Sequence, residues 1–159
     1  MSADKVAIAL LADHPAAVGD LRRLFESEWP DYYGADGPGD AAADLAAFCS
    51  RDALPIGVVA LHEGAAIGVA ALKSASIDEC PQFAPWAAAA LVAPAWRRRG
   101  VGAELILALE ELARQRGHAA LYTGTATAIG LMRRLGWEYL QTARQGGQDV
   151  AVFRKRLRD

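Results

Sequence analysis

Apolar residues along this 159-residue chain recur with two periods, which predict alternating strands and helices. The apolar run 6–11 predicts a first strand. Apolar positions at helical spacing over 16–29 predict the first helix, and Pro30 is expected to end it because proline cannot continue a helical hydrogen-bond ladder. Residues 31–39 are rich in Gly, Pro and Asp and are expected to form a loop, after which Asp40 is placed to cap a second helix.

The middle of the chain predicts a β region. Residues 56–62 and 67–72 are expected to form a hairpin across a Glu-Gly turn. The segment 74–85 is polar at its centre and predicts an irregular connection. Residues 86–92 are apolar throughout and predict a buried strand, which Pro94 stops.

The strongest helical pattern in the chain begins at Gly100 and ends at Gly117, a residue well suited to a helix C-terminus. Its apolar face consists of residues spaced by three or four positions: Val101, Leu105, Leu109 and Leu112. Four elements are predicted to follow, in order a strand, a short helix stopped by glycine, and two strands: 119–123, 127–135, 137–142 and 149–154.

This order of elements predicts a mixed α/β fold with a largely antiparallel sheet, in a single domain over 1–159. The strand 86–92, the long helix and the strand 119–123 form a strand–helix–strand unit. Such crossovers are right-handed and join parallel strands, so these two strands are expected to run parallel.

Composition narrows the class of protein. Hydrophobic residues make up 53% of the chain, which is globular rather than disordered composition, and the apolar stretches are too short to span a bilayer. The first five residues lack the pattern of a secretion signal, so we expect a cytoplasmic protein with no membrane partner. Two cysteines without a Cys-x-x-Cys and three scattered histidines predict neither a disulfide framework nor a metal site.

Positive charge is local rather than widespread. The net charge is −2, whereas nucleic-acid binders usually carry a broad basic surface, so no nucleic-acid partner is expected. Arg97, Arg98 and Arg99 form a cluster in the middle of the chain. A cluster of this size favours a small anionic ligand over a polyanion.

The junction at residues 97–102 has the features of a phosphate site. The first backbone N–H groups of a helix have no internal partners, and the helix dipole adds positive charge there. Gly100 and Gly102 carry no Cβ and let an anion approach the backbone closely. The segment is not a Walker loop, and Leu105 stands where a dinucleotide fingerprint needs its third glycine.

The segment Arg97-Arg98-Arg99-Gly100-Val101-Gly102 fits the pattern Arg/Gln-x-x-Gly-x-Gly/Ala. Later in the chain, Leu135-Gly136-Trp137 is similar to the Leu-Gly-aromatic ending of many enzymes that share this pattern. In these motifs and in the order of its elements, the chain resembles the GNAT superfamily of acyl-CoA-dependent N-acyltransferases.

The resemblance implies a mostly antiparallel sheet of six to seven strands with a central parallel pair and about four flanking helices. It also implies a V-shaped opening between the strands 86–92 and 119–123, in which acetyl-CoA lies as co-substrate. The pantetheine arm would bond to the backbone near Leu91 and Val92, and the pyrophosphate would sit on the amides of residues 98–103. The implied cofactor-binding residues are Leu91, Val92, Arg97, Arg98, Arg99, Gly100, Val101, Gly102 and Ala103.

The resemblance further implies an N-acetyltransferase, in which a primary amine of a small molecule or peptide attacks the thioester directly. A backbone N–H near Leu91 would polarise the acyl carbonyl, as in an oxyanion hole. Many members of the superfamily pair as dimers, so a homodimer is one arrangement open to this chain.

The proton transfers depart from the family pattern. Many members reprotonate the thiolate with a tyrosine, but alignment on Leu135-Gly136-Trp137 places Met132 at that position, and methionine cannot donate a proton. Solvent remains an alternative donor, because a thiol's reference pKa is about 8.5. Four side chains nearby in sequence are alternative proton donors: Tyr122, Tyr139, Thr123 and Thr125. Of these, Tyr122 is assigned with Asp78 and Glu79 to the expected catalytic residues.

Asp78 and Glu79 occupy the segment in which several members place an acidic base, acting directly or through water. A solvated loop is an equally good interpretation of these carboxylates. For the acceptor, an aromatic pocket with Asp31 or Asp36 beside it is one hypothesis, and ordinary core packing of the tryptophans is the other. The aromatic candidates are Trp29, Tyr32, Tyr33, Phe83 and Trp86.

Two other classes of function stay open from sequence. Met132 at the tyrosine position is compatible with a non-catalytic module that binds acyl-CoA and regulates another process. The glycine-containing turn before a helix is also compatible with a nucleotide-binding α/β protein.

Overall fold

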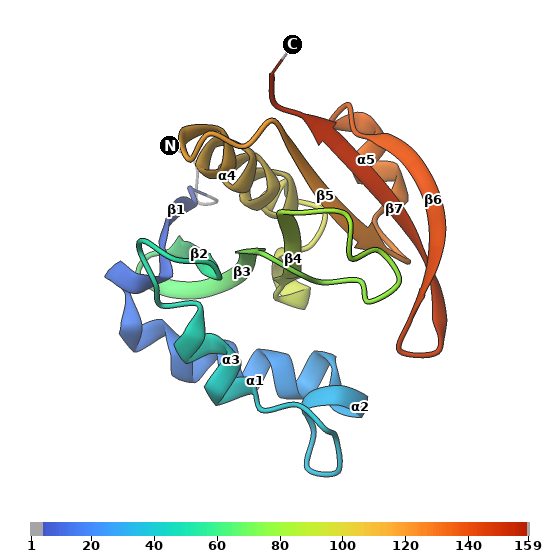
Figure 1. Ribbon diagram of the computed structural model, residues 1–159. Helices are drawn as coiled ribbons and strands as arrows, with labels where there is room; N and C mark the ends of the chain where they lie inside the picture. The colour runs from blue at the N-terminus through green and yellow to red at the C-terminus, as the bar shows by residue number, and fades with distance from the viewer. Residues whose placement is uncertain (1–4, 159) are drawn as a thin grey trace.

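The computed structural model of the protein describes residues 5–158. Two predictions fall partly outside this range. They are the domain limits at residues 1 and 159, and the absence of a secretion signal, which depends on residues 1–4. Seven strands form one sheet in the order β1-β2-β3-β4-β5-β7-β6 (Figure 1). Their bounds are β1 Ala7–Leu10, β2 Ile56–His62, β3 Ala65–Lys73, β4 Trp86–Val92, β5 Ala120–Thr125, β6 Glu138–Gln145 and β7 Gln148–Arg156.

Five α-helices and three short 3₁₀ helices accompany the sheet within residues 5–158. The α-helices are α1 Val18–Glu28, α2 Pro30–Tyr33, α3 Ala41–Ala47, α4 Val101–Gln115 and α5 Ile129–Arg134. The 3₁₀ helices are η1 Leu11–Asp13, η2 Pro15–Ala17 and η3 Pro94–Trp96. The pair β4–β5 is parallel and the other neighbouring strands are antiparallel, which confirms the predicted mixed α/β class and the central parallel pair.

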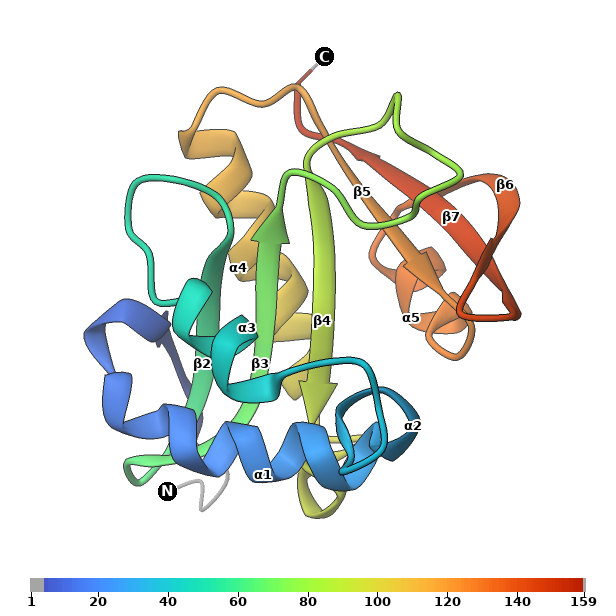
Figure 2. The same cartoon turned by 60° about the horizontal axis from the view of Figure 1, so that its bottom comes forward.

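The first half of the sheet, β1 to β4, is covered on both faces. Helix α4 packs against one face, whereas α1 and α3 lie on the other (Figures 1 and 2). Alternate residues of each strand serve the two layers, because successive side chains of a strand point to opposite faces. Val58 therefore belongs to the core under α4, and Val59 to the core under α1 and α3.

Most elements form where the local pattern predicts them. Leu105 and Leu109 of α4 are fully buried, as expected for its apolar face. Asp40 caps α3 as predicted, since its Oδ1 accepts a hydrogen bond from Ala43 N at 3.0 Å.

Residues 30–33 are an exception: they form the short helix α2, so the prediction of a loop beginning at residue 31 was wrong there. Pro30 ends α1 but also starts α2, because the fixed φ of proline suits the first position of a helix.

The second half of the sheet, β5 to β7, is covered differently. The connection 74–85 crosses above β5 and β7 instead of a helix (Figure 2). Although this connection is irregular as predicted, Ile77 and Cys80 are buried in it and pack with Trp86, Val150 and Val152. The segment is therefore fixed by two buried anchors.

Candidate active site

The two parallel strands at the centre of the sheet touch at one end only. Trp86 and Tyr122 form the single Cα pair between β4 and β5. Tyr122 N donates to Pro85 O at 3.0 Å, and the Thr123 hydroxyl donates to Ala87 O at 2.8 Å. Beyond these contacts the strands diverge toward the end of β4, as Figure 2 shows.

A strained residue marks the start of the divergence. Ala89 has φ +54°, and the register between β3 and β4 shifts between Val69 and Ala71. A left-handed conformation costs a non-glycine residue about 1–2 kcal/mol, so the surrounding structure must impose it. After this bulge β4 pairs only with β3, through Leu91 and Val92.

Backbone groups of β4 face the open side in a defined order. Ala93 N donates to Ile67 O at 2.8 Å, toward β3. Because neighbouring residues of a strand direct their polar groups to opposite sides, Leu91 faces β3 and Val92 faces the divergence. The Val92 carbonyl accepts a hydrogen bond from Arg97 Nε at 3.1 Å. The Val92 N–H is thus the donor that β4 directs into the open side near its end.

The N-terminus of α4 lies at this open end. The first helical hydrogen bond runs from Glu104 N to Gly100 O at 3.1 Å, so the amides of residues 101–103 have no acceptor in the helix. Arg98 and Gly100 both adopt positive φ, +63° and +83°. Such turns direct successive N–H groups toward a common point, which favours anions.

Gly102 lies between the end of β4 and α5. A Cβ added there would be 3.7 Å from Leu131 Cδ2 and 3.9 Å from Val92 Cγ2, which are ordinary contacts. Packing within the protein therefore does not require glycine at this position. Close approach of a ligand to the backbone would explain a glycine at this position.

The three arginines before α4 have different surroundings. The Arg97 guanidinium turns toward α1 and pairs with Glu28. The Arg99 guanidinium lies over the Trp96 ring, 5.0 Å from its centroid, in a cation–π contact. Arg98 is exposed. The cluster predicted as one positive patch thus divides: Arg97 pairs with a distant helix, Arg99 packs on Trp96, and Arg98 is exposed on the loop.

Tyr122 lies at the closed end of the divergence. Its ring stacks on Phe83, with centroids 4.6 Å apart and an interplanar angle of 6°. Arg154, opposite it on β7, pairs with Glu138. The hydrogen bond to Glu138 is the main cause that raises the pKa of the Arg154 guanidinium, and a hydrogen bond to Tyr122 adds to the shift. Arg154 is therefore placed to donate to the Tyr122 oxygen.

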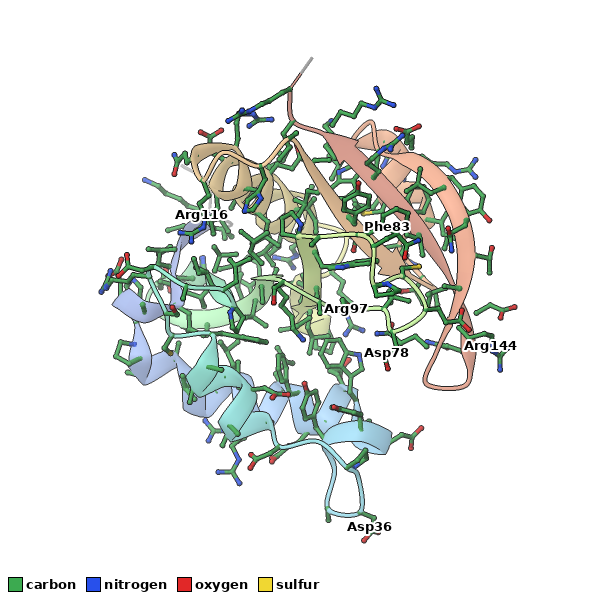
Figure 3. The ribbon with its side chains drawn as sticks, viewed as in Figure 1. Asp36, Asp78, Phe83, Arg97, Arg116 and Arg144 are labelled. Atoms are coloured by element: carbon green, nitrogen blue, oxygen red, sulfur yellow. The ribbon has the colours of Figure 1, made fainter. Side chains whose placement is uncertain are left out.

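The two carboxylates predicted as bases lie on the connection 74–85. Glu79 Oε1 accepts a hydrogen bond from Arg144 N at 2.8 Å, which attaches the connection to β6. Asp78 is exposed, and Figure 3 shows it on the same connection as Phe83. Burial, and then the charge of Glu79, raise the pKa of the Cys80 thiol, so this cysteine is not activated as a nucleophile.

The other proton donors considered from sequence already have structural partners. Thr123 bonds to Ala87 O, and Tyr139 bonds to Thr142. Thr125 Oγ1 accepts from Ala128 N at 2.9 Å in the turn that precedes α5, a role that the sequence pattern did not reveal. Met132 is 2% exposed and packs in the core under α4.

The aromatic residues predicted to line one acceptor pocket form two separate groups. Trp29 and Tyr33 pack against Phe25 of α1, and Tyr32 packs on Tyr33. Phe83 and Trp86 instead pack with Tyr122. Trp86 is a core residue at 1% exposure, which is the alternative weighed from sequence.

The polar neighbours of these aromatic residues also separate. Tyr33 donates to Asp44 Oδ2 at 2.7 Å, and burial, followed by this bond, raises the pKa of Tyr33. Asp31 is exposed on α2, and Asp36 lies at the tip of the loop after α2, away from Asp78 and Phe83 (Figure 3).

Residues 5–158 contain no group of three or more His, Cys, Asp or Glu side chains arranged to hold a metal ion. None of the helices within this range is both long and apolar enough to cross a membrane.

Several solved structures share this fold at low sequence identity. An aminoglycoside 6'-N-acetyltransferase complexed with coenzyme A superposes with a TM-score of 0.77 at 15% identity, covering 95% of this chain and 97% of that one. The Enterococcus faecium aminoglycoside 6'-N-acetyltransferase gives 0.76 at 15% identity, over 95% and 97%. A putative acetyltransferase from Salmonella typhimurium with its cofactor acetyl-CoA gives 0.71 at 20% identity, over 96% and 94%.

The sequence comparison reaches the same family. No curated protein matches the chain at a significant level of sequence similarity. The sequence profile of the Acetyltransferase (GNAT) family matches residues 21–137, which include β4, the loop 97–100, α4, β5 and α5. With the diverging parallel strands and the helix N-terminus at their open end, this match shows that the protein is an acyltransferase that belongs to the GNAT acetyltransferase family.

Proposed function

We propose that this enzyme is an N-acetyltransferase that moves an acetyl group from acetyl-CoA to a primary amine of a small molecule or peptide. The observation that carries the proposal is the divergence of β4 from β5, with the N-terminus of α4 at its open end. An extended, phosphate-bearing thioester fits this combination, since one part of the site offers strand-like bonding and the other offers free helical amides.

Binding of acetyl-CoA would use backbone groups first. The amides of residues 98–103 hold the pyrophosphate, and the absence of a Cβ at Gly102 lets the phosphate approach. The Val92 N–H bonds to the pantetheine arm, while Leu91 stays paired with β3. A backbone N–H at the bulge around Ala89 and Leu91 polarises the acyl carbonyl.

The reaction needs two proton movements. The amine nitrogen forms a bond to the carbonyl carbon, and the tetrahedral intermediate collapses as the carbon–sulfur bond breaks. The ammonium form of the acceptor must first lose a proton, and the departing thiolate must gain one.

Glu79 or Asp78 accepts the proton of the ammonium, directly or through water. Glu79 is the carboxylate with a defined orientation, because Arg144 N donates to one of its oxygens. Tyr122 is the candidate donor to the thiolate. Arg154 lies opposite Tyr122 in the β5–β7 pair.

The acceptor would enter from the side formed by α1, α2 and the connection 74–85, opposite α4. Aminoglycoside N-acetyltransferases are among the structures with this fold, which supports an amine acceptor. A cytoplasmic location and a homodimer remain expectations of the same proposal.

Acetyl-CoA turnover against a panel of amines, amino acids and peptide N-termini tests the proposal. We expect release of free CoA that depends on one class of amine. Tight binding of CoA without turnover across the panel would contradict the proposal and favour a regulatory module. Thermal protection by ATP or NAD, but not by CoA, would refute the cofactor assignment.

Two conservative variants test the proton transfers. Glu79→Gln removes a charge but keeps an oxygen that accepts from Arg144 N, and Tyr122→Phe keeps the ring stacked on Phe83. We expect each to lower kcat while CoA affinity is retained. If the pH–rate profile of Glu79→Gln keeps its acidic limb, Asp78 or solvent performs the first transfer.

A further inference from the structure

One arginine of the phosphate motif is bound to a helix far away in sequence. Arg97 Nη2 pairs with Glu28 Oε1 in the last turn of α1, 69 positions earlier in the chain. The Arg97 Nε also donates to Val92 O at 3.1 Å. A single guanidinium therefore joins the end of β4, the start of the phosphate loop and the end of α1, and Figure 3 shows Arg97 near the end of β4.

Glu28 is the last residue of α1 and lies directly before the junction with α2. Trp29 follows it at the end of α1, and Tyr33 N donates to Trp29 O at 2.8 Å, so the junction of α1 and α2 begins at this residue. The body of α1 is fixed by Leu21 and Phe25, both fully buried.

Apolar packing also joins the end of α1 to β4, since Leu24 and Trp29 share a core cluster with Ala89. The strand carries a run of four alanines at 87–90, which offer only methyl groups to a neighbouring helix. The Glu28 side chain is 24% exposed and that of Arg97 is 48% exposed, so the pair is partly shielded from water. The ion pair thus adds a polar contact between this end of α1 and the segment that follows β4.

We propose that Glu28 and Arg97 form a latch that positions the acceptor side of the site relative to the acetyl-CoA loop, and that Arg97 is a positioning residue rather than a phosphate ligand. The inference rests on the proposed function, because it takes α1 and α2 as one wall of the acceptor site. Within the motif Arg97–Gly102, Arg97 would position α1, and the backbone amides that follow it would bind the phosphates.

Charge supports this division. The Arg97 guanidinium is compensated by a carboxylate and a carbonyl of the protein, so it adds little net positive charge for a pyrophosphate. The backbone amides before Glu104 remain for the phosphates, as does Arg98, which is exposed on the loop. Removing the Arg97 charge should then affect the acceptor more than the cofactor.

The test uses Glu28→Gln, Arg97→Gln and the double variant, with Glu26→Gln as the matched control. Glu26 pairs with Arg22 within α1 at 3.2 Å and contacts no other element through that pair. Circular dichroism melting of each variant checks that the fold is retained.

We expect both single variants to raise KM for the amine acceptor by about two- to fivefold, the scale of a partly exposed ion pair. The double variant should be no worse than either single one, because both remove the same contact. The Kd for CoA, measured by calorimetry, should stay within about twofold, a change that the loss of a phosphate ligand would exceed.

Hydrogen exchange gives a readout that does not depend on any activity. The hydrogen-bonded amides of Trp29, Tyr32 and Tyr33 should exchange faster in Glu28→Gln and Arg97→Gln than in Glu26→Gln. This result would support the latch even if the parent protein turned over no amine, in which case the proposed function alone would fail. The latch is wrong if exchange is unchanged, or if Arg97→Gln weakens CoA binding tenfold while Glu28→Gln does not.

Discussion

The two ends of β4 are built by different means. At the closed end, Trp86 is buried and its indole N–H donates to Phe83 O at 2.7 Å, while the Thr123 hydroxyl bonds to Ala87 O. At the open end, the strand has Ala89 in a left-handed conformation, and the Val92 N–H is directed away from β3.

Within the seven residues of β4, one end therefore contributes mainly to stability and the other mainly to ligand binding. The closed end gains its free energy from a large side chain and satisfied hydrogen bonds. The open end leaves backbone groups for a ligand and accepts strain at Ala89. Variants at the closed end should therefore change the free energy of unfolding, and variants at the open end should change binding.

Trp86→Ala should have the largest effect. It removes a fully buried ring and the bond to Phe83 O, so we expect a loss of about 3–5 kcal/mol in the free energy of unfolding. Urea denaturation monitored by circular dichroism measures it, with Trp86→Phe as the milder control. A loss below about 1 kcal/mol would show that the closed end is not the stable part of the strand.

Gly102→Val should weaken CoA binding by about a hundredfold, which corresponds to two lost charge-assisted hydrogen bonds of about 1.5 kcal/mol each. The free energy of unfolding should not fall, because a Cβ at this position meets only ordinary contacts. Calorimetry with CoA and thermal melting test the two parts, with Gly102→Ala as an intermediate step. Unchanged affinity would place the pyrophosphate elsewhere.

Thr123→Val should cost about 1–2 kcal/mol of stability, since it keeps the side-chain volume and leaves Ala87 O without its hydroxyl partner. Thr123→Ser, which keeps the hydroxyl, should recover much of the loss in a denaturant titration. Equal stability of the valine and serine variants would mean that this bond does not hold the strands together.

Ala89→Gly should have the smallest effect, a gain of up to about 1 kcal/mol in the free energy of unfolding, because glycine adopts φ +54° without strain. Ala89→Val should instead lose stability. We expect the glycine variant to turn over acetyl-CoA more slowly, since a freer backbone holds the polarising N–H less firmly. Thermal melting and kcat of both variants decide this point.

Local patterns were sufficient for much of the fold. The strands 56–62 and 86–92 and the helix after Gly100 form where hydrophobic periodicity predicts them, because each depends on neighbours within one or two turns. Helix α2 was missed because Pro30 was interpreted only as a stop, although proline also suits a first helical position.

Parts of the candidate site were likewise predictable from sequence, whereas other parts depend on contacts between distant segments. The loop 97–102 was identified from sequence because its glycines and its helix N-terminus are adjacent in the chain. The connection 74–85 was correctly expected to be irregular, but its anchoring by Ile77 and Cys80 depends on residues of β7 that are about 70 positions away. The five aromatic residues formed one hypothetical pocket in sequence, with core packing as the alternative, and they pack as two groups in space.

The sequence by itself determined most of the order of elements, the parallel crossover and the glycine-containing turn at the N-terminus of α4, since short-range periodicity, helix-terminus chemistry and the handedness of crossovers act within one segment of chain. Only the tertiary structure decided that Arg97 pairs with Glu28, that Ala89 is strained, and that β4 and β5 meet at a single Cα pair. These features arise where segments distant in sequence compete for the same hydrogen bonds and charges, and a local pattern does not record the outcome of that competition.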